Sequence, residues 1–171
     1  MAATTQEGAA VGKPVSAPRG LAAQRIRPGA GSKRTPVNEF QARHFAHLIR
    51  ALEQALLAHY RAPSVDRLPA DRFEEAWALD EYRLFCEGAY ACGFVCNDFK
   101  PDGPLDAAKA RPEATIAGWD FFTLRHYIHT LLRAEKWADG YSSPILDAVI
   151  CGALHAVADR LDTDESLNET L

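Results

Sequence analysis

Apolar residues recur at helical spacing through most of the chain after residue 36. The pattern is clearest between Asp120 and Leu161. Two apolar stripes follow each other there, formed by Phe121, Leu124, Ile128, Leu131 and Leu132 and then by Ile145, Val149, Ile150, Leu154, Val157 and Leu161. Each stripe has to be buried against another element, because a helix cannot cover its own apolar face. Gly140 suits a left-handed helix end, Ser143 an N-cap and Pro144 a first helical position. The sequence therefore predicts a hairpin of two helices joined at Gly140.

Further helices are predicted upstream of this hairpin. Asn38 and Gln41 have the spacing of a capping box, and the apolar stripe that follows runs toward Tyr60 before Pro63. A second helical stretch covers residues 70 to 91, either unbroken or restarted at Asp80 after a kink. Its expected buried residues are Phe73, Trp77, Leu84, Phe85, Ala89 and Tyr90. Because no alternating strand pattern is repeated, we predict an all-α fold, a small bundle of about four main helices.

The first 36 residues differ from the rest in composition and charge. They hold four Pro, five Gly and six Lys or Arg against the single Glu7, and they show no apolar periodicity. Such a segment cannot offset the entropy of ordering it. We therefore predict a disordered basic arm over residues 1–36, a single helical domain over 37–162 and a short acidic tail over 163–171. A transit peptide is the less favoured interpretation of the arm, since its prolines oppose an amphipathic helix.

Charge and hydropathy limit the classes of partner and the compartment. Residues 37–171 hold thirteen Lys or Arg against twenty-two Asp or Glu, a poor composition for binding phosphate backbones. Only the arm, through Arg25, Arg27, Lys33 and Arg34, offers weak nucleic-acid association, and a solubilising tail is the favoured alternative. No apolar run is long enough to cross a membrane, and no secretory signal is recognisable. We expect a cytoplasmic protein with free thiols, no membrane contact and an undetermined oligomeric state.

Residues able to carry chemistry are present but do not form a known pattern. His44 with His47, and His126 with His129, could each share a helical face, and Cys92 and Cys96 have a spacing that zinc tolerates. A complete ligand set is not suggested, and neither a Glu-x-x-His motif, a nucleophile elbow nor a phosphate-binding glycine loop occurs. The sequence therefore predicts no metal site and no cofactor, and it favours a non-enzymatic protein without excluding an enzyme.

The candidate site is a cluster of charged and aromatic residues just before Gly140. It consists of Arg133, Glu135, Lys136, Trp137 and Asp139. One interpretation makes them the solvated end of a helix, with Lys136 complementing the helix dipole. In the other, Arg133 is partly buried and pairs with Glu135, Asp139 or a bound anion. The two interpretations differ in whether this cluster is a structural joint or a functional site.

The segment R-A-E-K-W-A-D-G, from Arg133 to Gly140, carries a resemblance. With Thr123-Leu124 before it, Arg160-Leu161 after it and G-F-V-C-N-D-F from Gly93, it resembles a family of uncharacterised bacterial proteins with an R-A-[DE]-[RK]-[FW]-x-x-G signature. Glu135 and Lys136 stand where that family commonly has Asp and Arg. The resemblance implies a helical fold and a bacterial cytoplasmic setting, and it brings no activity.

Three hypotheses of function follow from these patterns. The leading one is a non-enzymatic helical protein-interaction or accessory protein of bacterial origin, from a mobile or phage-derived element. The alternative is a small enzyme or ligand-binding domain with its site around Arg133, Glu135, Trp137 and Asp139. The weakest is nucleic-acid association through the arm.

Overall fold

The computed structural model describes residues 37–95, 103–138 and 140–163. The predicted arm, residue Asp139 and nearly all of the predicted acidic tail lie outside this range. Across the described residues the chain forms eight α-helices and two short 3-10 helices, with no strand, which confirms the all-α prediction. In order these are α1 (Glu39–Tyr60), η1 (Val65–Arg67), η2 (Ala70–Arg72), α2 (Phe73–Trp77), α3 (Asp80–Ala91), α4 (Ala107–Ala110), α5 (Pro112–Ala117), α6 (Phe121–Lys136), α7 (Pro144–Ile150) and α8 (Ala153–Thr163). The four longest, α1, α3, α6 and α8, correspond to the main helices of the predicted bundle.

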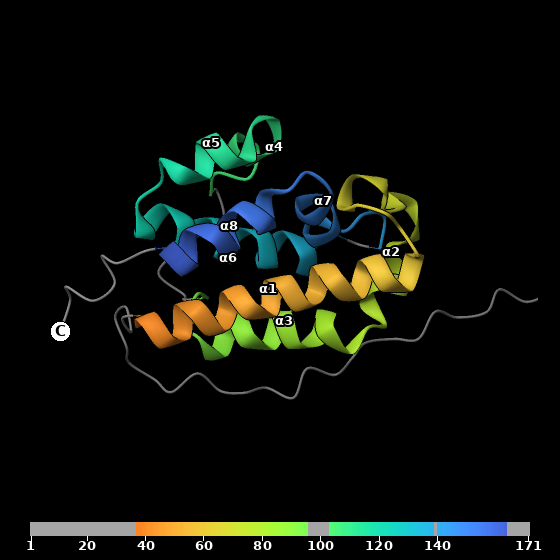
Figure 1. Ribbon diagram of the computed structural model, residues 1–171, viewed down its shortest axis with the longest axis horizontal. Helices are drawn as coiled ribbons and strands as arrows, with labels where there is room; N and C mark the ends of the chain where they lie inside the picture. The colour runs from red at the N-terminus through yellow and green to blue at the C-terminus, as the bar shows by residue number, and fades with distance from the viewer. Residues whose placement is uncertain (1–36, 96–102, 139, 164–171) are drawn as a thin grey trace, which may run out of the picture. The chain divides into compact units, whose positions relative to one another are not determined.

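Helix α1 begins and ends as its sequence predicts. The backbone amide of Gln41 donates to the Asn38 side chain at 2.9 Å, and the Asn38 amide donates to the Gln41 side chain at 2.9 Å, which completes the capping box. Arg61, with φ 50°, closes the helix two residues before Pro63. Helix α1 packs lengthwise against α3 on one side and α8 on the other (Figure 1). It is the element that α3 and α8 share.

The second helical stretch is broken, as the alternative with a restart at Asp80 anticipates. Helix α2 ends at Trp77, and α3 starts afresh at Asp80. The new helix turns Tyr82, Phe85 and Ala89 inward, because these residues recur at intervals of three and four. The prediction that Leu84 and Tyr90 are buried is wrong, since they face away from this stripe and are 44% and 55% exposed.

The C-terminal hairpin is present, but its second arm is shorter than expected. Helix α6 ends at Lys136, Gly140 has φ +75°, and Pro144 opens α7 as predicted. The expectation of one continuous stripe from Ile145 to Leu161 is wrong, because Gly152 adopts φ +79° and separates α7 from α8. Helix α7 therefore stays against α6, while α8 packs on α1 and α5.

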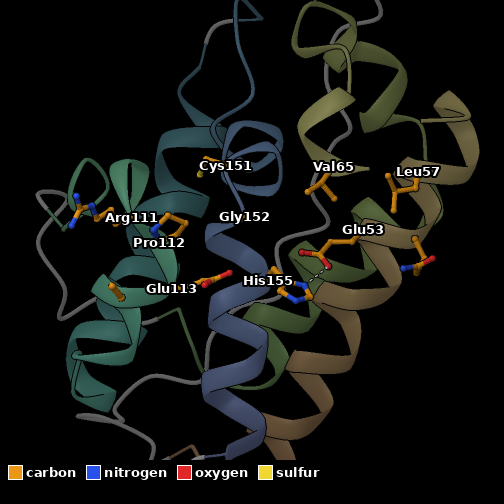
Figure 2. A pocket seen from close by; sticks show the side chains of 11 residues that line it. Glu53, Leu57, Val65, Arg111, Pro112, Glu113, Cys151, Gly152 and His155 are labelled. Carbon is orange, nitrogen blue, oxygen red and sulfur yellow. Dashed lines mark hydrogen bonds and ion pairs between the residues drawn. The ribbon is translucent and has the colours of Figure 1, made fainter. Parts of the chain in front are cut away.

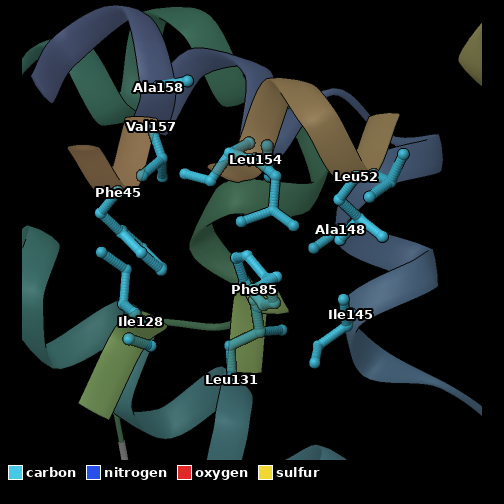
Figure 3. Close-up of a cluster of buried hydrophobic side chains, with 14 of the residues drawn as sticks. Phe45, Leu52, Phe85, Ile128, Leu131, Ile145, Ala148, Leu154, Val157 and Ala158 are labelled. Atoms are coloured by element: carbon cyan, nitrogen blue, oxygen red, sulfur yellow. The ribbon is translucent and has the colours of Figure 1, made fainter. Parts of the chain in front are cut away.

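One hydrophobic core joins the four long helices with α7. Phe45 of α1 lies at its centre, with ring centroids 5.3 Å from Phe85 and 4.6 Å from Phe94. Ile128 of α6 and Leu154 of α8 come from opposite sides toward the same cluster (Figure 3). Helix α6 is buried on all sides from Tyr127 to Leu132 and leads to the joint with α7. Within the described part of the chain, no helix has the length and apolarity needed to span a bilayer.

Candidate functional site

Glu135, in the last turn of α6, is the centre of the joint between the hairpin helices. Its carboxylate accepts hydrogen bonds from four donors on three other parts of the chain. The indole of Trp77 donates to Oε1 at 2.7 Å, and the hydroxyl of Tyr82 donates to the same oxygen. The Ser143 hydroxyl lies 2.9 Å from Oε1, and the amide of Ile145 donates to Oε2 at 2.9 Å. We call this arrangement the Glu135 clamp, because one carboxylate ties α6 to α2, α3 and α7.

The clamp also completes the start of α7. The first amides of a helix have no partner within the helix and need an external acceptor. Ser143 accepts from the amide of Leu146 at 3.1 Å, as an N-cap does, and Glu135 accepts from the preceding amide of Ile145. The hydroxyl of Ser143 thus receives one hydrogen bond and donates another to Glu135. The carboxylate also lies where the partial positive charge of a helix N-terminus favours an anion.

The groups around Glu135 are held in their neutral, protonated forms. Burial is the main cause that raises the pKa of Tyr82, followed by the adjacent Glu135 carboxylate, so this phenol remains a donor. Burial and then Glu135 raise the pKa of the Cys86 thiol to about 12. A thiol with such a pKa is not a nucleophile near neutral pH. The clamp therefore has the chemistry of a structural joint.

The opposite side of the same helix end is turned toward solvent. Arg133, Lys136 and Trp137 are spaced i, i+3 and i+4, so they share a face, while Glu135 lies about 200° around the helix from Arg133. Arg133 and Lys136 are exposed, and Trp137 is 67% exposed. Tyr141, in the turn after Gly140, is 89% exposed. We call Arg133, Lys136, Trp137 and Tyr141 the joint surface.

Four of the five residues of the predicted cluster are described, and they separate into two environments. Glu135 is half-buried in the clamp, and Arg133, Lys136 and Trp137 lie on the joint surface. The interpretation that makes Arg133 partly buried is wrong, since Arg133 is exposed. The Glu135 carboxylate accepts from Trp77, Tyr82, Ser143 and Ile145. Asp139 lies outside the described residues.

The histidines and cysteines considered as metal ligands are dispersed. Among the residues that the structure describes, no group of three or more His, Cys, Asp or Glu side chains is arranged to hold a metal ion. His44 and His47 are exposed on α1, whereas His129 of α6 is buried, and burial lowers its pKa. Cys86, Cys92 and Cys151 are free thiols, and Cys96 lies outside the described range.

A second polar site, between α1, α5 and α8, was not anticipated. Glu53 of α1 is only 5% exposed, and its Oε2 lies 3.2 Å from Nδ1 of His155 on α8. The two residues line a hollow of about 650 Å³ (Figure 2). The sequence does contain a signal for this site. In a helical projection of α1, Glu53 lies beside Leu52 and three positions before Leu56, which places it on the flank of the apolar stripe. The partner His155 is 102 residues away, and nothing local pairs the two.

Comparisons with family models, with curated proteins and with solved structures each return no match. The interpretation of both sites rests on their geometry.

Proposed function

We propose that the protein is a non-enzymatic protein-interaction module and that its joint surface binds a short acidic segment of a partner protein. The observation that carries the proposal is the position of Trp137, a large aromatic side chain left 67% exposed at a helix end. Tryptophan, tyrosine and arginine are enriched among the residues that dominate binding energy at protein interfaces. Three of the four residues of the joint surface are of these types.

The charge of the joint surface supports an acidic occupant. Arg133 and Lys136 are both exposed and flank Trp137, while Glu135, one of the two acids of the segment, is turned inward and engaged by four donors. The described residues of the joint surface therefore carry two positive charges and no negative one, on a domain that is acidic as a whole. An acidic segment with one large apolar side chain would match both the charges and the aromatic rings.

The Glu135 clamp supports the proposal in a second way. A binding surface gains affinity when its residues are held in place before the partner arrives. Trp137 follows the last residue of α6, and its amide donates to the carbonyl of Ala134 at 3.1 Å. The clamp fixes that helix end against α2, α3 and α7, so the aromatic side chain projects from a rigid base.

The test is a display selection of random peptides on the full-length protein, followed by affinity measurements on the enriched peptides. We expect acidic peptides with an aromatic or large aliphatic residue. Trp137→Ala should weaken their binding by about tenfold or more, as expected for a central aromatic anchor, and leave the thermal midpoint unchanged. Arg133→Glu should weaken peptide binding more at low salt than at high salt, because salt screens the interaction between exposed charges.

Tyr90→Ala is the matched control, because Tyr90 is 55% exposed on α3 and lies outside the joint surface. Enriched peptides that bind Trp137→Ala and the wild type equally well would refute the proposal. Binding of anionic vesicles in place of peptides would assign the surface to lipid, and self-association lost in Trp137→Ala would assign it to a second copy. Either result also overturns the proposal.

The remaining parts of the proposal concern origin and setting. We infer kinship with the bacterial family that carries the R-A-[DE]-[RK]-[FW]-x-x-G signature, and with it a cytoplasmic accessory role. The opposite orientations of Glu135 and Trp137 support this inference. They explain the acidic position of the signature by its place in the Glu135 clamp and the aromatic position by its place on the joint surface. Nucleic-acid association through the basic arm is the weaker alternative, and the acidic composition of residues 37–171 argues against a larger contact.

A further inference from the structure

Charged side chains join α8 to α1 alongside the hydrophobic contact between the two helices. Arg50 of α1 pairs with Asp159 of α8 at 2.9 Å, and it also pairs with Asp162 of α8. One turn further along α1, Glu53 pairs with His155 of α8 (Figure 2). We call these five residues the α8 latch, because every one of these pairs crosses from α1 to α8.

His155 lies between two carboxylates of the latch, one opposite each ring nitrogen. Its Nδ1 is 3.2 Å from Oε2 of Glu53, and its Nε2 is 3.6 Å from Oδ2 of Asp159. A neutral imidazole has one donor and one acceptor nitrogen, an imidazolium has two donors, and an ionised carboxylate can only accept. With a neutral ring, one nitrogen would direct its lone pair at a carboxylate. The positions of the two carboxylates therefore fit the protonated ring.

Glu53 has little else to compensate for its charge. Its side chain is 6% exposed, and its Oε1 is buried without a hydrogen-bond partner among the described residues. A buried carboxylate is costly unless a counter-charge or hydrogen-bond donors offset its desolvation. Burial is the main cause that raises the pKa of Glu53, and the hydrogen bond and then the charge of His155 are the largest effects that lower it. His155 is thus the principal group that neutralises Glu53.

The other charges near His155 do not take the place of its proton. Arg50 already faces two carboxylates of α8. Arg111 and Glu113 of α5 line the hollow beside His155 and have opposite charges, and Cys151 is the remaining titratable group of its lining. With a neutral His155 the latch holds one positive and three negative charges, and a proton on His155 adds a second positive charge.

We propose that the α8 latch is a pH-sensitive device, which holds α8 against α1 while the Glu53–His155 pair carries a proton and loosens α8 when that proton is lost. The pair retains one proton whether it resides on the ring or on the carboxylate. Histidine is the side chain whose charge changes between about pH 5 and 8. Because the folded state favours the proton, α8 is held most firmly at the acidic end of this range and loosens as the pH rises. The device acts on helix packing and does not depend on the proposed protein interaction.

The test is amide hydrogen exchange of the full-length protein, measured by nuclear magnetic resonance at about pH 6 and about pH 8 and corrected for intrinsic exchange rates. We expect the protection of buried α8 amides, such as those of Leu154 and Val157, to fall by about three- to fivefold relative to α3 amides between the two values, as the loss of one partly exposed charge pair implies. His155→Gln should remove this difference, because glutamine does not titrate.

Matched variants and a second measurement keep the result interpretable. His47→Gln is the control for His155→Gln, because His47 is exposed on α1 and makes no ion pair with another described residue. Glu53→Gln should also reduce the difference, whereas Glu74→Gln, at an exposed position on α2, should retain it. In the wild type, the ring signals of His155 should change with pH in parallel with α8 protection.

Three results would overturn the proposal. One is a change in α8 protection that is the same in the wild type and in His155→Gln. Another is an equal change in the protection of α3 and α8, which would show that the proton acts on the whole fold. The third is a ring titration of His155 that occurs at a different pH from the change in α8 protection.

Discussion

Two glutamates with different hydrogen bonding decide much of the chemistry at the residue scale. Glu135 accepts from an indole, a phenol, a hydroxyl and a backbone amide, so its charge is well solvated by the protein. Glu53 is more deeply buried, its Oε2 pairs with His155, and its Oε1 has no hydrogen-bond partner among the described residues. The first is a structural acceptor, and the second is a desolvated acid that is paired with a histidine.

The ionisation of Glu53 predicts a pH dependence of stability. Its pKa in the folded protein is raised above the ordinary value of 4.5, chiefly by burial, so the charged form is disfavoured in the folded state. Below pH 4.5 the group is protonated in both states and contributes nothing to the slope. As the pH rises through the folded pKa, the wild type should lose free energy of unfolding relative to Glu53→Gln.

The measurement is chemical unfolding of both proteins at a series of pH values from 4 upward, with Glu74→Gln as a second reference. Asp159 and Arg50 are retained in both proteins, so the difference reports the carboxyl group of Glu53 together with its coupling to His155. A difference between wild type and Glu53→Gln that stays constant across the series would show that the carboxyl group has the same pKa in the folded and unfolded states.

At the scale of elements, local signals in the sequence predicted where helices start better than how far they continue. Asn38 with Gln41 and Ser143 with Pro144 each act within a few residues, and the structure places both helix starts as expected. The break at Gly152 was missed, because the apolar stripe continues on both sides of it. A glycine between two apolar turns is compatible with a continuous helix, and its actual conformation depends on α8 turning to pack on α1 and α5.

Gly152 therefore gives a prediction about the break. It has φ +79°, and an added Cβ would lie 3.9 Å from Pro112, an ordinary contact. The cost of Gly152→Ala should come from backbone strain alone, about 1 kcal/mol of unfolding free energy. Gly118→Ala is the matched control, because Gly118 ends α5 with φ −83° and an added Cβ has room there. The prediction fails if Gly152→Ala is as stable as Gly118→Ala.

At the scale of the whole molecule, the sequence predicted the all-α class and the hairpin but not what the candidate residues contact. The partners of Glu135 on α2 and α3 are 58 and 53 residues away from it, and those of Glu53 and Arg50 on α8 are more than 100 residues away. Such pairs form only when α1, α3, α6 and α8 assemble around the core. The sequence showed that Arg133 to Asp139 is a charged cluster, and tertiary packing determined which member faces inward.

The cluster at the end of α6 combines a structural acid, Glu135, with an outward-facing surface that contains Arg133. The most direct test is the free energy of unfolding of Glu135→Gln and Arg133→Ala compared with the wild type. Glu135→Gln preserves size but replaces one acceptor oxygen with an NH2 donor that faces other donors, so we expect a loss of about 2 kcal/mol. Arg133→Ala removes an exposed side chain, so we expect a change within about 0.5 kcal/mol. A stable Glu135→Gln protein together with a destabilised Arg133→Ala protein would contradict the claim.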